Sequence, residues 1–236
     1  MNLKDRAIIL EKKLLKENHY IVTCFTEKNG IYSGVVRNNK KLNNPNAEGN
    51  LIDFLWNARL HEHLGYLKIE TIKSYNAYII SDKTKLYAFN SLVSLLKVFF
   101  YEREPHNNLF PKLLDFINGL KEGFSIKKYF LLELDILSES GHHLNLDKCA
   151  SNGSRENLMY VSPRSGRAVS KEAGSIFANK LLELPQFLIN ECPIKKQDIN
   201  AAYILTNYFM NRYILLDKPK PTARECFFQH ILSRFC

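Results

Sequence analysis

Residues 20–36 read YIVTCFTEKNGIYSGVV and predict a β-hairpin. In the first arm, Ile21 and Phe25 fall on one face of a strand, because side chains alternate along an extended backbone. Asn29 and Gly30 both tolerate a positive φ, which makes this pair a strong turn signal between two strands. The chain is therefore expected to return as a second strand, antiparallel to the first.

Further strands are expected on either side of this hairpin. They cover residues 7–15, 51–60 and 66–75. A polar stretch rich in Asn, over residues 37–49, is typical of a long exposed loop between two strands. Five short strands in this part of the chain indicate a small closed barrel.

Beyond residues 81–85 the hydrophobic period becomes that of a helix. Apolar residues from Leu86 to Phe100 are spaced three and four apart, which predicts a central, buried helix. Other helices are expected from near Pro111 to Leu120, over residues 125–140 and 198–216, and close to the C-terminus. On the helix at 125–140, the predicted buried face consists of Ile126, Phe130, Leu134 and Leu137.

The composition narrows the class of protein. The chain has 236 residues, a formal net charge of +9 and a pI of about 9.2. This charge favours phosphate-rich or carboxylate-rich partners, with nucleic acid and a merely basic protein as equal alternatives. Five scattered cysteines favour free thiols in a reducing cytosol. Because no signal-peptide segment or membrane-length apolar stretch is visible, a cytoplasmic protein is expected.

No catalytic motif stands out. The sequence has no Gly-rich phosphate loop, no HExxH and no nucleophile elbow. His61 and His63 would share one face of a strand while Glu62 points away, so a solvated strand end is favoured over a metal site. We therefore predict no catalytic residue, no metal ligand and no cofactor, with a site assembled only by folding as the open alternative.

Basic residues in loops are the stronger functional signal. Arg37, Lys40 and Lys41 project from the polar loop, where cations reach phosphates without being buried. Small barrels bind single strands by combining such cations with aromatic stacking platforms. The candidate aromatics are Tyr32, Trp56, Tyr66 and Tyr75, although for each of them a place in the core or on the barrel surface is favoured over a stacking role. Secondary nucleic-acid contacts are predicted at Arg59, Arg164, Arg167 and Lys171. For the last three, a solvated loop that leads to a helix N-terminus is an equal alternative.

Several local strings resemble one known family. They are DRAIIL at residues 5–10, LLELDILSESGHHLNLDKCASNG at 131–153, LLELPQFL at 181–188 and PTARECFFQHIL at 221–232. The most specific string is YVSPRSGRAVSKEAG at 160–174. With the order of elements, these strings resemble the RecO family of bacterial recombination mediators along essentially the whole chain.

The resemblance implies a fold and a function. The fold class would be α+β, with an OB-like DNA-binding β-barrel over residues 1–80 and a helical domain over residues 81–236. The protein would not be an enzyme and would hydrolyse no nucleotide. It would bind single- and double-stranded DNA, anneal complementary strands and act with RecR. It would also engage the acidic C-terminal tail of the single-strand-binding protein and help to load the RecA recombinase, in the cytoplasm and associated with the nucleoid.

The chain departs from the family pattern at a metal site. Many RecO proteins hold zinc with two CxxC pairs in the middle of the helical domain. Here the four positions are Cys149, Asn152, Ser170 and Ala173. One thiolate cannot complete a tetrahedral zinc site. We therefore predict a zinc-free, degenerate finger over about residues 144–173.

A site for the acidic tail is predicted on the helical domain. The receptor for such a tail needs an apolar pocket with cations at its rim. Lys127, Lys128 and Tyr129 offer both at the start of one helix, and Phe99 and Phe100 could form the pocket wall. The alternative is that the aromatic rings are plain core and the lysines plain surface.

Two rival functions belong to other classes. One is a nucleic-acid-modifying or hydrolytic enzyme, which would show convergent ionisable residues in a deep pocket. The other is an RNA-binding protein with an OB-like barrel. An extended basic face without such a pocket would favour the mediator.

Overall fold

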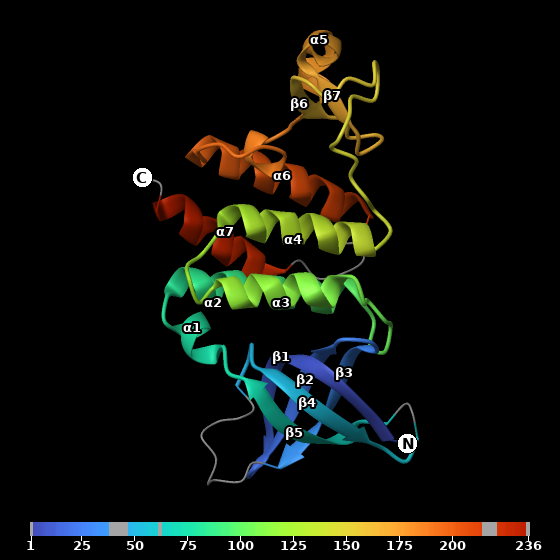
Figure 1. The fold of residues 1–236 in the computed structure, drawn as a ribbon, viewed down its shortest axis with the longest axis vertical. Helices are drawn as coiled ribbons and strands as arrows, with labels where there is room; N and C mark the ends of the chain where they lie inside the picture. Colours follow the sequence, from blue (N-terminus) through green and yellow to red (C-terminus); the bar gives the residue numbers. More distant parts are fainter. Residues whose placement is uncertain (1, 38–46, 61–62, 214–220, 235–236) are drawn as a thin grey trace. The chain divides into compact units, whose positions relative to one another are not determined.

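Five strands close the N-terminal barrel that the sequence predicts (Figure 1). Around the barrel the order is β1, β2, β3, β5, β4; β3 and β5 are parallel and the other pairs are antiparallel. The strands are β1 (Asn2–Lys16), β2 (His19–Thr26), β3 (Gly30–Arg37), β4 (Leu51–Asn57) and β5 (Gly65–Lys73). The computed structural model describes residues 2–37, 47–60, 63–213 and 221–234.

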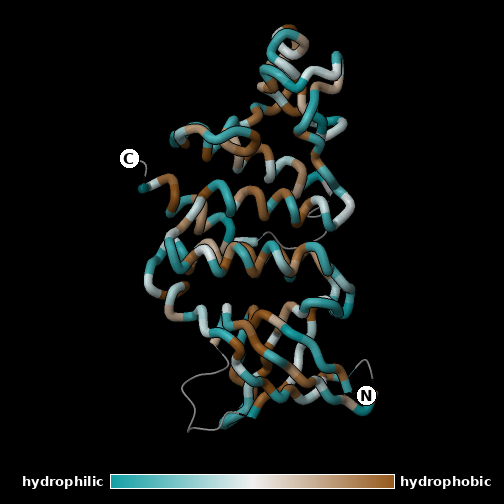
Figure 2. The backbone as a smooth tube through the Cα atoms, viewed as in Figure 1, coloured by the Kyte–Doolittle hydropathy of each residue, from teal (hydrophilic) through white to brown (hydrophobic). Residues whose placement is uncertain are grey.

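Alternating side chains fill the barrel interior. Hydrophobic and hydrophilic stretches both occur along the strands in Figure 2, and burial alternates along β4, where Phe54 and Trp56 are buried. Trp56 is 1% exposed, and its indole Nε1 donates to the Ser33 carbonyl at 3.2 Å. The predicted strand over 51–60 ends early, at Asn57, so Leu60 is 47% exposed although alternation had placed it inside.

The predicted hairpin turn is confirmed, and two separate constraints require a glycine at its end. β2 pairs with β3 up to Gly30, whose φ is +78°. A Cβ at Gly30 would also lie 1.9 Å from the Glu104 carbonyl oxygen. The Asp5 carboxylate fixes the same turn, because its Oδ2 accepts from the Lys28 backbone N–H at 3.0 Å and from Asn29 Nδ2 at 2.7 Å.

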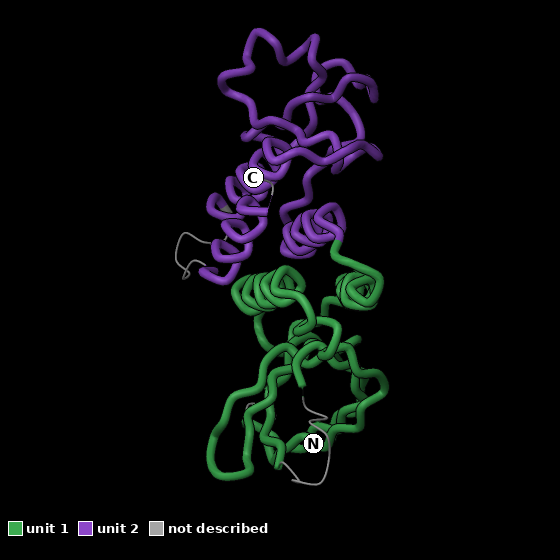
Figure 3. The backbone as a smooth tube through the Cα atoms, turned by 90° about the vertical axis from the view of Figure 1, so that its left-hand side faces the viewer, with its two compact units in different colours: residues 1–124 green, residues 125–236 purple. Residues whose placement is uncertain are grey.

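A buried asparagine connects the barrel to the helices that follow it. Asn50 is 2% exposed, and its Oδ1 accepts from the backbone N–H groups of Tyr75 and Asn76 at 2.9 and 3.1 Å. The helices of this part are α1 (Asn76–Ile80), α2 (Lys83–Phe99) and α3 (Leu109–Gly119). The short helix α1 was not predicted. Together with the barrel, these helices form a compact unit over residues 1–124, which we call unit 1 (Figure 3).

Residues 125–236 form the second compact unit, unit 2 (Figure 3). Its long helices agree with the predicted ones: α4 (Ile126–Glu139), α6 (Lys196–Tyr213) and α7 (Thr222–Arg234). Between α4 and α6 the chain forms β6 (Leu158–Val161), β7 (Ala168–Ser170), α5 (Lys171–Gly174), η1 (Ser175–Lys180), β8 (Leu182–Glu183) and η2 (Gln186–Leu188). The strands make a small sheet in the order β7, β6, β8, which the expectation of an all-helical domain had omitted.

A buried ion pair joins the helices of unit 2. Glu133 on α4 and Arg224 on α7 have side chains that are 0% and 3% exposed. Two guanidinium nitrogens of Arg224 bind both carboxylate oxygens, at 2.6 and 2.9 Å. Thr206 on α6 and Tyr129 donate their hydroxyls to the same carboxylate at 2.8 and 2.7 Å.

The Arg224 guanidinium is held in its charged form. Burial lowers the pKa of Arg224, but the Glu133 carboxylate and its hydrogen bonds more than compensate and raise the pKa above its ordinary value. The Arg224 guanidinium also lies 4.3 Å from the centre of the Tyr203 ring, on α6. Three helices thus share one satisfied polar centre, where a lone charge would be costly.

Among the described residues, no helix combines the length and the apolar character that crossing a membrane requires.

The ion pair predicts a strong coupling between two substitutions. Arg224→Met should lower the free energy of unfolding by about 3–5 kcal/mol, because it leaves the Glu133 carboxylate buried without its cation. Adding Glu133→Gln removes the stranded charge and should recover part of that loss. Urea unfolding of the two single variants and the double variant measures the coupling. Additive effects would contradict it.

Candidate nucleic-acid interface

One outward face of the barrel combines lysines with an exposed aromatic ring. Pairing of β1, β4 and β5 places Lys4, Leu55 and Lys68 in one row across the strands. The next row contains Asn2, Asn57 and Tyr66, and the Tyr66 side chain is 71% exposed. We call these six residues the barrel face. Two cations beside a solvent-exposed ring are the groups that hold a phosphate backbone and a stacked base.

The barrel face has an acidic border on one side. The row beyond Lys4 pairs Arg6 with Asp53 and Asp53 with Glu70. Arg6 is itself bound by Glu27 at 2.5 Å, and this hydrogen bond and charge raise the pKa of Arg6. An anionic strand is therefore expected to follow the rows of Lys4 and Tyr66 and to avoid the carboxylates.

The predicted loop cation Arg37 lies at the end of β3, where its side chain is exposed. Strand pairing places it opposite His19, which pairs in turn with Lys16 on β1. Sequence reading missed these two neighbours, which lie on other strands. Lys40 and Lys41, the other two predicted loop contacts, fall outside the described residues.

The other residues of the barrel that we predicted to contact nucleic acid differ in their exposure to solvent. Arg59 lies two residues beyond the end of β4 and is exposed. Of the four candidate aromatics, Tyr66 is exposed, whereas Tyr32, Trp56 and Tyr75 are 5%, 1% and 3% exposed and belong to the core. Tyr66 is therefore the one of the four that is open to a ligand in the part of the chain that the structure describes.

The predicted finger cations are exposed and lie next to the small sheet of unit 2. Arg164 and Arg167 occupy the turn between β6 and β7, and Lys171 is the first residue of α5. The turn is closed by a backbone hydrogen bond from the Ser162 N–H to the Arg167 carbonyl, at 2.9 Å, and is anchored to α6 by a hydrogen bond from Arg212 to the Pro163 carbonyl. These cations are carried by unit 2 and the barrel face by unit 1.

Comparison with known proteins decides the family. A family model described as "Recombination protein O N terminal" matches residues 1–75, and one described as "Recombination protein O C terminal" matches residues 80–222. The chain belongs to the RecO family. It is 46% identical over 237 residues to "DNA repair protein RecO" of Rickettsia rickettsii (strain Iowa), covering 100% of both chains. It is 47% identical over 236 residues to the same-named protein of Rickettsia canadensis (strain McKiel), covering 99% of this chain and 98% of the relative.

This RecO-family chain is thus similar to DNA repair proteins over its full length. The family accounts for the mixed fold, with a barrel first and helices after it. The boundary between the two family models, at residues 75–80, lies where strands give way to helices.

The zinc positions of this RecO chain form a hydrogen-bonded cluster that does not fit a metal. The Cys149 sulfur is buried and accepts from the Ser170 backbone N–H at 3.3 Å. Ser170 Oγ in turn accepts from the Ala173 backbone N–H at 3.4 Å. Among the residues with described positions, no group of three His, Cys, Asp or Glu side chains could hold a metal ion. That the protein contains no zinc stays a prediction.

The Cys149 cluster favours a thiolate. Burial raises the pKa of the Cys149 thiol, but the backbone amides of Ser170, Asn152 and Ser151 outweigh it and bring the pKa down to about 7. Amides that point at a sulfur stabilise its negative charge. Cys149 therefore keeps the electrostatic setting of a metal ligand, while hydrogen bonds connect the residues around it.

The residues predicted to bind an acidic tail differ in accessibility. Phe99 and Phe100 are 6% and 5% exposed in unit 1, and Tyr129 is 1% exposed in unit 2, where its hydroxyl is bound to Glu133. Lys127 is bound to Glu191 at 2.5 Å. The Lys128 side chain is exposed at the start of α4. An arriving acidic peptide would therefore meet Lys128 more readily than the three rings.

The lowered pKa of Cys149 predicts a pH-dependent contribution to stability. A thiol whose folded-state pKa is depressed stabilises the fold above its unfolded pKa of about 8.5, and the contribution is lost as the pH falls through about 7. The difference in unfolding free energy between the parent and Cys149→Ala should therefore grow by about 1–2 kcal/mol from pH 6.5 to pH 9.

Urea titrations across this pH range test the Cys149 assignment. Cys226→Ala, which removes an exposed thiol from α7, is the matched control. A difference between parent and Cys149→Ala that stays constant with pH would show that Cys149 is an ordinary buried thiol.

Proposed function

We propose that the chain binds DNA through the barrel face and acts as a recombination mediator in DNA repair. The observation that carries the proposal is the pairing register that brings Lys4 and Lys68 beside the exposed ring of Tyr66. Lysines contact phosphates of any sequence, and an aromatic ring stacks on any base. Recognition of this kind suits a protein that works on DNA irrespective of its sequence.

We also propose that the chain has the individual activities of a recombination mediator. The chain anneals complementary strands, acts with RecR, engages the acidic tail of the single-strand-binding protein and helps to load RecA. It works by binding, without a covalent step. Its membership of the RecO family and its full-length similarity to DNA repair proteins support this assignment. The exposed cations Arg37, Arg59, Arg164, Arg167 and Lys171 are proposed as further DNA contacts, together with Lys40 and Lys41.

Substitutions on the barrel face should separate charge from stacking. Lys4→Ala with Lys68→Ala should weaken binding of a single-stranded oligonucleotide and reduce its salt dependence, by about 0.7 in log–log slope per lost phosphate contact. Tyr66→Ala should cost about 1–3 kcal/mol in binding free energy with little change in that slope, because it removes stacking and no cation. Fluorescence anisotropy at several salt concentrations measures both effects.

The matched control for the lysines is Lys121→Ala, which removes an exposed lysine from the turn after α3. It should change affinity and slope little. If the double lysine variant behaves like this control, the barrel face is not the DNA site. Replacing Arg37, Lys40 and Lys41 with Ala then tests the loop as the alternative contact.

The acidic-tail site gives a separate prediction. Lys128→Glu should weaken binding of a peptide that ends in acidic residues and an apolar residue with a free carboxylate, because the charge at the start of α4 is reversed. Lys127→Glu would also break the ion pair with Glu191, so its effect on the peptide would be mixed with the loss of that pair. Isothermal titration with the peptide measures the effect, and Lys121→Glu is the matched control. Equal affinity in the parent and Lys128→Glu would place the tail site elsewhere.

A further inference from the structure

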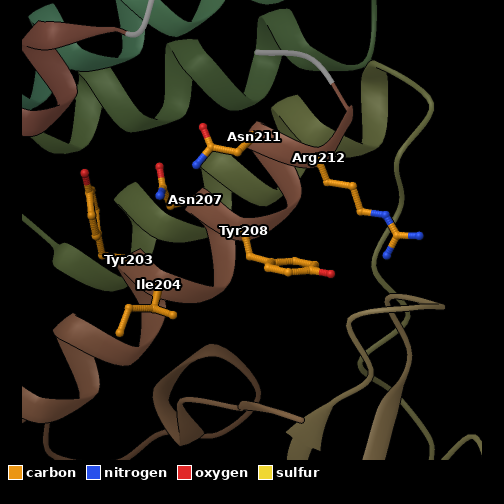
Figure 4. Close-up of a pocket in the computed structure, with 6 residues that line it drawn as sticks. All are labelled: Tyr203, Ile204, Asn207, Tyr208, Asn211 and Arg212. Atoms are coloured by element: carbon orange, nitrogen blue, oxygen red, sulfur yellow. The ribbon is translucent and has the colours of Figure 1, made fainter. Parts of the chain in front are cut away.

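A groove with a volume of about 460 Å³ follows α6 in unit 2 (Figure 4). Two rows of residues, each spaced four apart, line it, because residues four apart lie on the same side of a helix. One row is Tyr203, Asn207 and Asn211, and the other is Ile204, Tyr208 and Arg212. None of the six lining side chains is acidic.

The first row is held in place by α7. The ring of Tyr203 stacks on Phe228, with centroids 3.7 Å apart and planes inclined by 9°. Asn207 Oδ1 accepts a hydrogen bond from Nη1 of Arg224 at 3.3 Å. This side of the groove is thereby fixed to the buried Glu133–Arg224 pair, so it has little freedom to lose when a ligand binds.

The second row is open to solvent. Ile204 and Tyr208 are 49% and 36% exposed, and Arg212 is exposed at the far end of the row. Figure 4 shows the Tyr208 ring and the Arg212 side chain extending to the same side of α6. The hydrogen bond from Arg212 to the Pro163 carbonyl places the turn that carries Arg164 at this end.

The chemistry of the groove matches an unpaired nucleotide. An exposed ring accepts the flat face of a base, amides can both donate to and accept from its edge, and guanidinium groups bind phosphate. An acidic peptide would use only the donors, and Ile204 is the one aliphatic side chain among the six lining residues. The groove therefore suits a nucleic acid better than a peptide with an apolar end.

We propose that the α6 groove is a second site for single-stranded DNA, with a base stacked on Tyr208 and a phosphate at Arg212 and Arg164. The inference rests on the proposed function, because it takes DNA as the partner. The barrel face belongs to unit 1 and the α6 groove to unit 2. One chain then offers separate surfaces to two strands, which is what annealing requires.

The test uses the full chain and an oligothymidylate that carries 5-iododeoxyuridine, a base that crosslinks to nearby aromatic rings under light. Mass spectrometry of the parent should locate a crosslink at Tyr208. In a chain that already carries Tyr66→Ala, adding Tyr208→Ala should weaken single-strand binding about tenfold, the equivalent of about one stacked base. Binding of a blunt duplex should change little, because paired bases cannot stack on the ring.

Two control variants accompany Tyr208→Ala. Tyr208→Phe keeps the ring and should remain within about twofold of its parent. Tyr101→Ala removes a tyrosine that is 69% exposed and lies outside the groove. If Tyr208→Ala lowers the melting temperature, Asn211→Asp replaces it, because a carboxylate in the groove repels phosphate and should weaken binding equally.

The outcomes separate this inference from the proposed function. If the parent binds no single-stranded DNA, the proposed function is wrong. If the parent binds but neither Tyr208→Ala nor Asn211→Asp weakens binding and no crosslink falls within residues 203–212, the groove inference alone is overturned. It is also overturned if these variants lose an acidic peptide and keep the oligonucleotide.

Discussion

The buried pair of Glu133 and Arg224 is the interaction on which unit 2 depends. It joins α4 to α7 and accepts a hydrogen bond from the hydroxyl of Thr206 on α6. The Arg224 guanidinium also lies over the ring of Tyr203 on α6. A buried carboxylate is tolerated only when each of its oxygens is satisfied, so the three helices can pack in few other ways. The α6 groove inherits this constraint, because one of its two rows is attached to the same centre.

The barrel depends on a different constraint, the closure of its five strands into a ring. A closed ring of strands places every second side chain inside, and the alternate residues of neighbouring strands come into contact outside. Lys4 lies on β1, whereas Tyr66 and Lys68 lie on β5, more than 60 residues later in the sequence. They share one face of the barrel because β4 pairs with both β1 and β5. A surface that carries the groups suited to DNA can therefore arise without a local basic motif.

The segment that we predict to be a zinc-free finger is held together by hydrogen bonds. Cys149 accepts a backbone hydrogen bond from Ser170, and Ser170 caps the short helix α5 through Ala173. Each of these hydrogen bonds is weaker than a metal–thiolate bond, but they connect the same positions. The finger then presents Arg164 beside the end of α6, where Arg212 holds the turn.

The sequence by itself determined the barrel hairpin, the five strands, the long helices and the family, because these depend on local periodicity, turn chemistry and characteristic strings. It also identified Arg37, Arg59 and the finger cations as exposed. Only the tertiary structure decided that Tyr66 is exposed while Tyr32, Trp56 and Tyr75 are core, and that Glu133 is buried on the face of α4. The same holds for the barrel face and the α6 groove. These features depend on which distant residue lies opposite, and a single strand or helix carries no record of its neighbours.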